Sequence, residues 1–507
     1  MSEQSSSMPT MFGNLTTPGR SGVLGASAGA SLAMVPFFLL AVMFLATQQL
    51  LFAVISIGAP LVLVVLSMTT RRQGRSIFRR MTMRWMQRRK EKSGKALYRA
   101  GATGHTPEGT TRIPGLLARS ELTEHTGSLN QTFGMLRVSG RGSHCYSVVL
   151  QAFPDGDALI DEDRLQRYVA NWGDWLAQRS LDENILGASV VVESAPDTGL
   201  RLNRLVASQR VADAPDFSTQ VTEAISDEYA AGSPEISVKV TVTFDGRDPA
   251  TGKDRGTKDM AEEIGPRLPG IIGGLSTTGA GRVQAATAQE IVDSTYLAYD
   301  PHASVAMEED RMRGGTGLTW HDVGPSFAYD AFDRYAHQRA VSASWSIWEQ
   351  PQGHFTAHAM RRALEPMAGV MRKRVALLYR PIPRSKSTHE VEQEMKDSTF
   401  AGSQQRMSQR AKARQAAAAK SAQEEAQGAG LSRFGMIVTV TLDNEDPDES
   451  DLQLRRLRRQ IPQHMTDTRL RLRETLANEA VSFQAGLPLG LVLPEHMMLP
   501  EDVRKWI

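Results

Sequence analysis

The segment closest to a phosphate-binding loop runs from Gly246 to Lys253. A phosphate loop places four residues between its two glycines and follows its lysine with a Ser or Thr that binds magnesium. Here five residues separate Gly246 from Gly252, and Asp254 follows the lysine. Because a carboxylate at that place repels phosphate, the segment does not predict a nucleotide site.

A second glycine-rich stretch covers residues 265–281. A dinucleotide-binding turn needs the pattern G-x-G-x-x-G leading directly into a helix. Gly279 and Gly281 supply its first two glycines, but Gln284 occupies the third place. We therefore predict that this stretch is a flexible surface loop.

Histidines offer two further arrangements to consider. His354 and His358 are four residues apart, the spacing that places two metal ligands on one face of a helix. Neither has a neighbouring Glu that could act as a general base, and Gly353 favours a helix that begins after His354. His144 and Cys145 are adjacent in a predicted strand, so their side chains point to opposite faces and do not form a nucleophile and base pair.

The remaining candidates indicate structure rather than chemistry. The acidic run 308–310 predicts a solvated loop, and an aromatic cluster predicts part of a core. The only cysteine is Cys145, which excludes an intrachain disulfide and fits a reducing, cytoplasmic setting. The sequence thus predicts no catalytic residue, cofactor or metal. The aromatic cluster consists of Trp320, Phe327, Tyr329, Phe332 and Tyr335.

An uncharged block near the N-terminus predicts a membrane anchor. Residues 30–68 contain no charged side chain, and their 39 residues suit two spans, since about 20 residues cross a bilayer core. Gln48 and Gln49 mark the turn between the two spans. The block is too long for the apolar region of a signal peptide. A buried helical hairpin in a soluble core is the alternative.

Basic residues follow this block directly. Between Arg71 and Arg99 there are 12 Lys or Arg residues and one acid, Glu91, in a chain whose net charge is only +2. Positive residues beside a span stay on the cytoplasmic side, so both termini are expected in the cytoplasm and the protein in the cell inner membrane. Trp85 and its methionine neighbours give the segment an apolar side. We predict contact with the anionic inner leaflet, with nucleic acid as the alternative, through Arg71, Arg72, Arg75, Arg79, Arg80, Arg84, Arg88, Arg89 and Lys90.

The rest of the chain alternates strand and helix patterns. Strands are predicted at 145–153, 185–193 and 236–244, with an amphipathic helix at 161–180 between the first two. This order predicts an α+β fold of ferredoxin-like (split βαβ) subdomains. A similar order returns after residue 340, with strands at 341–348, 374–379, 434–442 and 469–473 and helices at 356–370 and 451–460.

These patterns give a predicted organisation along the chain. It comprises a disordered N-terminal tail (1–29), a transmembrane helical hairpin (30–68), a basic juxtamembrane helix (69–100), a linker (101–130), a first α+β subdomain (131–300), a connecting loop region (301–340) and a second α+β subdomain (341–507) with a long inserted helical arm (385–428).

Several short phrases, together with this layout, resemble a known family. They are Ala298-Tyr-Asp-Pro301, Ala343-Ser-Trp-Ser-Ile-Trp348 and Phe483-Gln-Ala-Gly-Leu-Pro-Leu-Gly490. The chain resembles actinobacterial integral membrane proteins of conjugation-type gene clusters. In organisation it is similar to the two-helix membrane subunit of type IV secretion systems joined to the N-terminal, non-motor domain of the secretion ATPase.

The resemblance implies a non-enzymatic inner-membrane component of a type IV secretion or conjugation machine. Its expected partners are the lipid bilayer, a separate secretion ATPase, other secretion-complex subunits and further copies of itself. The C-terminal subdomain is expected to present the docking face for the ATPase. A membrane component of a type VII secretion system and a membrane-bound enzyme at the inner leaflet remain as alternatives.

Overall fold

The computed structural model describes residues 77–100 and 113–497, apart from gaps at 141–143, 157–159, 210, 212–214, 233, 350–353, 386, 388–391, 393–418, 420–422 and 424–429. It also describes Phe12, Gly13, Arg75 and scattered positions between 37 and 58. Most of the predicted tail, most of the predicted membrane hairpin and nearly all of the predicted arm at 385–428 lie outside these residues. No helix within the described part is both long and apolar enough to cross a bilayer.

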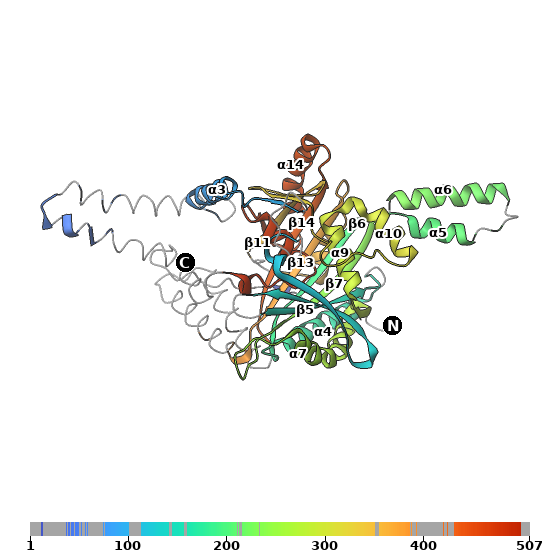
Figure 1. The fold of residues 1–507 in the computed structure, drawn as a ribbon, viewed down its shortest axis with the longest axis horizontal. Helices are drawn as coiled ribbons and strands as arrows, with labels where there is room; N and C mark the ends of the chain where they lie inside the picture. Colours follow the sequence, from blue (N-terminus) through green and yellow to red (C-terminus); the bar gives the residue numbers. More distant parts are fainter. Residues whose placement is uncertain are drawn as a thin grey trace, which may run out of the picture.

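One antiparallel sheet of 13 strands organises the body, as the α+β prediction requires (Figure 1). In the first half, β7 lies between β5 and β6, while β4 and β8 share the other edge of β5. The connection β5-α4-β6 therefore links two strands that are separated by a third. This half comprises β3 (Ser120–Thr126), β4 (Thr132–Ser139), β5 (His144–Phe153), α4 (Glu162–Ser180), β6 (Ile185–Pro196), β7 (Pro234–Asp245), α7 (Thr257–Ile264), α8 (Leu268–Leu275) and β8 (Arg282–Ala285).

The second half repeats this connectivity. Strand β14 lies between β11 and β13, while β10 and β15 share the other edge of β11. The described residues thus contain a structural duplication of a β-β-β-α-β-β-α-β unit. Its second copy comprises β9 (Phe327–Asp330), β10 (Tyr335–His337), β11 (Ala340–Glu349), α11 (Arg361–Leu364), β13 (Arg372–Pro381), β14 (Ser432–Asp443), α14 (Pro447–His464) and β15 (Arg471–Glu474).

The two units join through equivalent strands. Strand β6 pairs with β13 antiparallel, from Ala188 opposite Tyr379 to Ser194 opposite Lys373. Antiparallel pairing of equivalent strands relates the units by an approximate two-fold axis and merges their sheets. The segment between β13 and β14, which contains the predicted arm, occupies the same place in its unit as a helical hairpin between β6 and β7. That hairpin consists of α5 (Leu200–Gln209) and α6 (Asp216–Gly232) and projects from the body (Figure 1).

The structure corrects two segments of the predicted organisation. Residues 301–340 are not a connecting loop, because they contain α10 (Ser304–Arg313), β9 and β10. The acidic run 308–310 accordingly lies in a helix. The predicted linker 101–130 contains β3, which pairs along the edge of β4. Strands β9 and β10 contain four and three residues, too few to show a clear hydrophobic period.

Helices of both units cover one face of the sheet, and the glycine-rich stretch belongs to this layer. Residues 268–275 form α8, whose Leu268, Ile271 and Leu275 are buried, so the predicted flexible loop is wrong. A Cβ atom at Gly274 would lie 3.0 Å from Cδ1 of Trp175, and the Trp175 indole N–H donates to the Ile271 carbonyl oxygen at 3.2 Å. The glycine therefore permits close packing of a helix against an indole.

The opposite face is covered by α9 (Ala288–Tyr299), α15 (Glu479–Ala485) and the chain after α15. Residues 482–491, named the C-terminal strap here, are all buried. They pack on apolar side chains and on buried hydroxyl groups of the sheet. Thr241 donates to the Pro488 carbonyl oxygen at 3.0 Å, and Thr243 donates to that of Gly490 at 2.7 Å. The strap contains the Leu-Pro phrase of the family resemblance, and its burial removes that phrase from any docking surface.

Candidate membrane-surface site

The basic segment predicted to contact lipid forms α3 (Ile77–Lys92). Arg, Lys, Met and Gln favour helices, and the basic residues of its last turn complement the negative end of the helix dipole. These last-turn residues are Arg89, Lys90 and Lys92. A turn then leads into β2 (Leu97–Arg99), which pairs with β9 and joins the segment to the sheet.

The polar face of α3 is turned toward the body. The Gln87 side chain is 3% exposed and donates to the Asp330 carbonyl oxygen at 2.8 Å. Lys90 forms an ion pair with the Asp330 carboxylate, and the Arg84 guanidinium lies 5.7 Å from the centre of the Phe332 ring. These contacts attach the helix to β9 and the turn that follows it.

The outward face carries the large apolar side chains. Met81, Trp85 and Met86 are 64%, 61% and 62% exposed. The Arg89 guanidinium lies 5.7 Å from the Trp85 ring centre, and Arg88 is exposed beside it. A soluble helix normally turns its apolar stripe inward, so α3 is inverted relative to that rule. Apolar and aromatic side chains flanked by arginines are typical of helices that lie on an anionic membrane surface.

The nine predicted basic residues differ in their surroundings. Arg79, Arg84, Arg88 and Arg89 are exposed on α3, whereas Arg80 is partly buried. Arg75 is 6% exposed, and burial, with Arg473 nearby, lowers its pKa to about 10. Arg75 is thus buried in the body and does not face a membrane, and Lys90 is paired with Asp330. Arg71 and Arg72 lie outside the described residues.

Removing the Lys90 side chain should loosen α3 from the body. Lys90→Ala leaves Asp330, which is 5% exposed, without its cationic partner. A hydrogen bond to a charged group contributes about 1.5–3 kcal/mol, so amide exchange within α3 should accelerate about tenfold or more. Hydrogen–deuterium exchange with mass spectrometry measures this change. Lys92→Ala, on the exposed side of the same helix, should leave the rate unaltered; equal rates in both variants would show that the ion pair does not hold α3.

The two histidines considered as a metal pair lie on different elements. His354 belongs to β12 (His354–Phe355), which pairs with Phe12 and Gly13, whereas His358 lies in a short 3₁₀ turn with its Nε2 3.4 Å from a Glu162 carboxylate oxygen. The predicted helix 356–370 is shortened to this turn and α11. Glu365 is extended before Pro366, as a residue preceding proline prefers.

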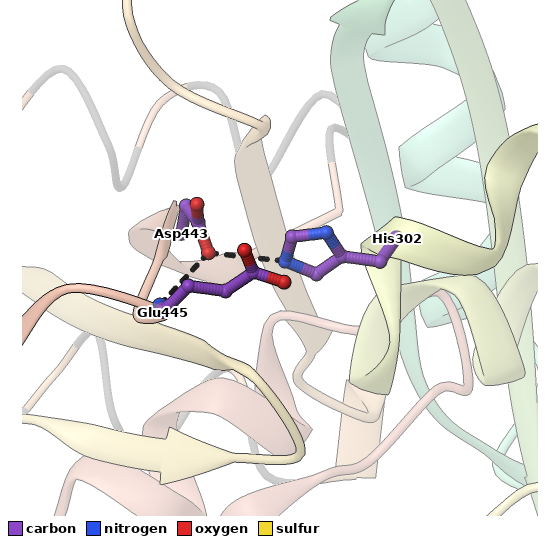
Figure 2. Close-up of side chains that lie close together, drawn as sticks. All are labelled: His302, Asp443 and Glu445. Atoms are coloured by element: carbon purple, nitrogen blue, oxygen red, sulfur yellow. Dashed lines mark hydrogen bonds and ion pairs between the residues drawn. The ribbon is translucent and has the colours of Figure 1, made fainter.

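Three side chains that could bind a metal lie close together, and no local pattern predicts this because His302 is far in the chain from Asp443 and Glu445 (Figure 2). His302 Nε2 lies 3.1 Å from an Asp443 carboxylate oxygen, which also accepts the Glu445 backbone N–H at 3.0 Å. The Arg339 guanidinium contacts Glu445 at 3.3 Å. Because both acids are exposed and a cation of the protein already approaches them, this arrangement is a surface ion-pair cluster.

One cavity among the described residues has a volume of about 1180 Å³. Trp172 lines it, together with Glu193 of β6 and Arg372 of β13. Burial alone would raise the pKa of Glu193, but Arg372 and Arg374 outweigh this effect and hold the pKa below its usual value. The charged groups therefore pair with each other across the junction of the two units.

Cys145 lies in β5 with 3% of its surface exposed. Burial, with a smaller effect of nearby acids, raises the pKa of its thiol to about 12. His144, next in sequence, points to Asp254 instead. The thiol is thus unreactive in the folded chain.

Comparisons of the sequence with protein-family models and with curated proteins give no match.

Proposed function

We propose that the protein is a non-enzymatic scaffold of the cell inner membrane that docks a separate ATPase in a type IV secretion-like or conjugation-like machine. The observation that carries the membrane part is the outward face of α3, with Met81, Trp85 and Met86 more than half exposed between arginines. The resemblance of the sequence to conjugation-type membrane proteins supports the ATPase part.

Lipid accounts for this face better than nucleic acid does. Phosphate groups of either partner attract arginines, and each basic residue near an anionic leaflet contributes about 1 kcal/mol. Nucleic-acid phosphates, however, give no reason for two exposed methionines beside Trp85. Burial of three large apolar side chains in the headgroup region adds about 1.5–3 kcal/mol for each side chain that is fully buried.

The body is proposed to be a pair of ferredoxin-like units that keeps α3 at a fixed distance from the ATPase contact. The ion pair of Lys90 with Asp330 and the pairing of β2 with β9 connect α3 to the sheet. The merged sheet gives a rigid connection between the two units. The spans expected at residues 30–68 would then place this body on the cytoplasmic side.

A polarity-sensitive dye tests the membrane contact. The dye is attached to a cysteine introduced by Met81→Cys in the full-length chain. Because Cys145 is buried, this cysteine is the one reactive thiol among the described residues. In nanodiscs with anionic lipid the dye emission should shift to shorter wavelength, and the shift should diminish at high salt. Leu129→Cys, on the body with Leu129 87% exposed, is the control and should show no shift. The same emission at both positions would contradict the proposed contact.

A further inference from the structure

The hairpin of α5 and α6, here called the arm and distinct from the predicted arm at 385–428, has no core among its described side chains. None of its described side chains is buried. Short helices gain most of their stability by packing an apolar face against a neighbour. The arm therefore lacks the packing that would stabilise two helices projecting from the body.

The arm has the apolar stripe that such packing requires. On α6, Phe217, Val221 and Ile225 are 76%, 39% and 51% exposed. They are four residues apart and share one face of the helix. On α5, Leu205 is 53% exposed. Each helix thus presents apolar side chains that the other helix of the arm does not cover.

Charge differs between the two helices. Helix α5 contains two arginines and no acid, whereas α6 contains four acids and no Lys or Arg. In a four-helix bundle made from two parallel hairpins around a two-fold axis that runs along the helices, equivalent helices lie diagonally and each helix has two unlike neighbours. Each α5 would then lie between two acidic helices, and each α6 between two basic ones.

From the exposed stripe and this charge pattern, we propose that the arm packs against the arm of a second copy of the chain to form a four-helix bundle. This inference goes beyond the membrane scaffold role. A second copy is the proposed partner of the arm, because each arm supplies a basic helix, an acidic helix and an apolar face on both.

The base of the arm is fixed in a direction that permits this pairing. The Arg201 guanidinium contacts the Glu308 carboxylate at 2.9 Å, and Thr198 donates to the same carboxylate. This attaches α5 to α10. The arm and α3 lie on opposite sides of the body (Figure 1). Two copies held side by side through α3 would both extend their arms away from that surface, parallel to each other.

Cross-linking in membranes tests the bundle with the full-length chain. Val221→Cys places a thiol in the stripe, while the buried Cys145 gives no background. A short bismaleimide should shift most of this variant from monomer to a dimer that contains only this chain. The matched control is Leu452→Cys on α14, because Leu452 is 48% exposed on a helix of the body. It should remain monomeric.

A second variant tests whether the cross-linked dimer depends on the apolar stripe of α6. Adding Phe217→Glu and Ile225→Glu to Val221→Cys should abolish the dimer band. Both side chains are exposed, so the thermal unfolding temperature of the body should be unchanged. A monomeric Val221→Cys variant, or one cross-linked only to another protein, would overturn the bundle. The second result, if that protein were the ATPase, would leave the proposed docking function intact.

Discussion

Replacing Gly490 by alanine should lower the free energy of unfolding by about 2–5 kcal/mol. Gly490 has a φ of +70°, which costs an L-residue about 1–2 kcal/mol. A Cβ atom there would lie 2.3 Å from Thr243 Oγ1, 2.6 Å from Ser147 Oγ and 2.8 Å from Thr241 Cγ2. All three neighbours are buried in the sheet under the strap, so they cannot all move aside.

Gly252→Ala separates the steric effect from backbone strain. Gly252 has a φ of +68°, but no atom lies within 4 Å of its Cβ position. This variant should lose only about 1–2 kcal/mol. Chemical denaturation of both variants gives the comparison. Equal losses would mean that the strap does not pack closely on the hydroxyl-lined face of the sheet.

Replacing Glu479 by glutamine should change how stability depends on pH. The Glu479 side chain is 1% exposed, and burial, only partly offset by hydrogen bonds such as that from the Ser344 backbone N–H, raises its pKa to about 8. The unfolded carboxyl group ionises near pH 4.5. Between pH 4.5 and about pH 8 the folded state keeps a proton on Glu479 that the unfolded state has lost, so a rise in pH lowers the free energy of unfolding. This effect amounts to about 4 kcal/mol by pH 8 and stops increasing above it.

Glutamine has no proton to lose, so Glu479→Gln removes this dependence. The variant should have nearly the stability of the parent at pH 5 and exceed it by a few kcal/mol at pH 8. Unfolding in urea across this pH range measures the difference. Glu262→Gln, at a side chain that is 71% exposed, should follow the parent curve throughout. A Glu479→Gln curve parallel to the parent would show that the carboxyl group is ionised in the folded state.

Long periodic elements could be predicted from the sequence because their own residues carry the signal. The strict alternation of residues 236–244 predicts β7, and the spacing of Leu165, Val169 and Trp172 predicts α4. The split βαβ order follows from these elements. The duplication could not be predicted, because strands β9 and β10 contain only four and three residues, and β9 pairs with β10 while β10 pairs with β11.

Contacts between residues far apart in the chain also explain why the structure of the glycine-rich stretch and the attachment of α3 could not be predicted. The glycines of α8 indicate a loop by composition, but Gly274 is needed for contact with Trp175. For the candidate site, the basic composition of α3 was evident, whereas its attachment through Asp330 was not. Asp330 lies 240 residues from Lys90 in the chain, and no local pattern connects them.

Recovery of the partners of the tagged full-length chain from membranes in mild detergent, followed by mass spectrometry, tests the central claim most directly. The proposed scaffold role predicts that a separate ATPase is recovered together with the chain, and that Gly252→Ala recovers it equally well. Recovery of the chain alone, or only with enzymes of lipid metabolism, would contradict the role in a secretion machine.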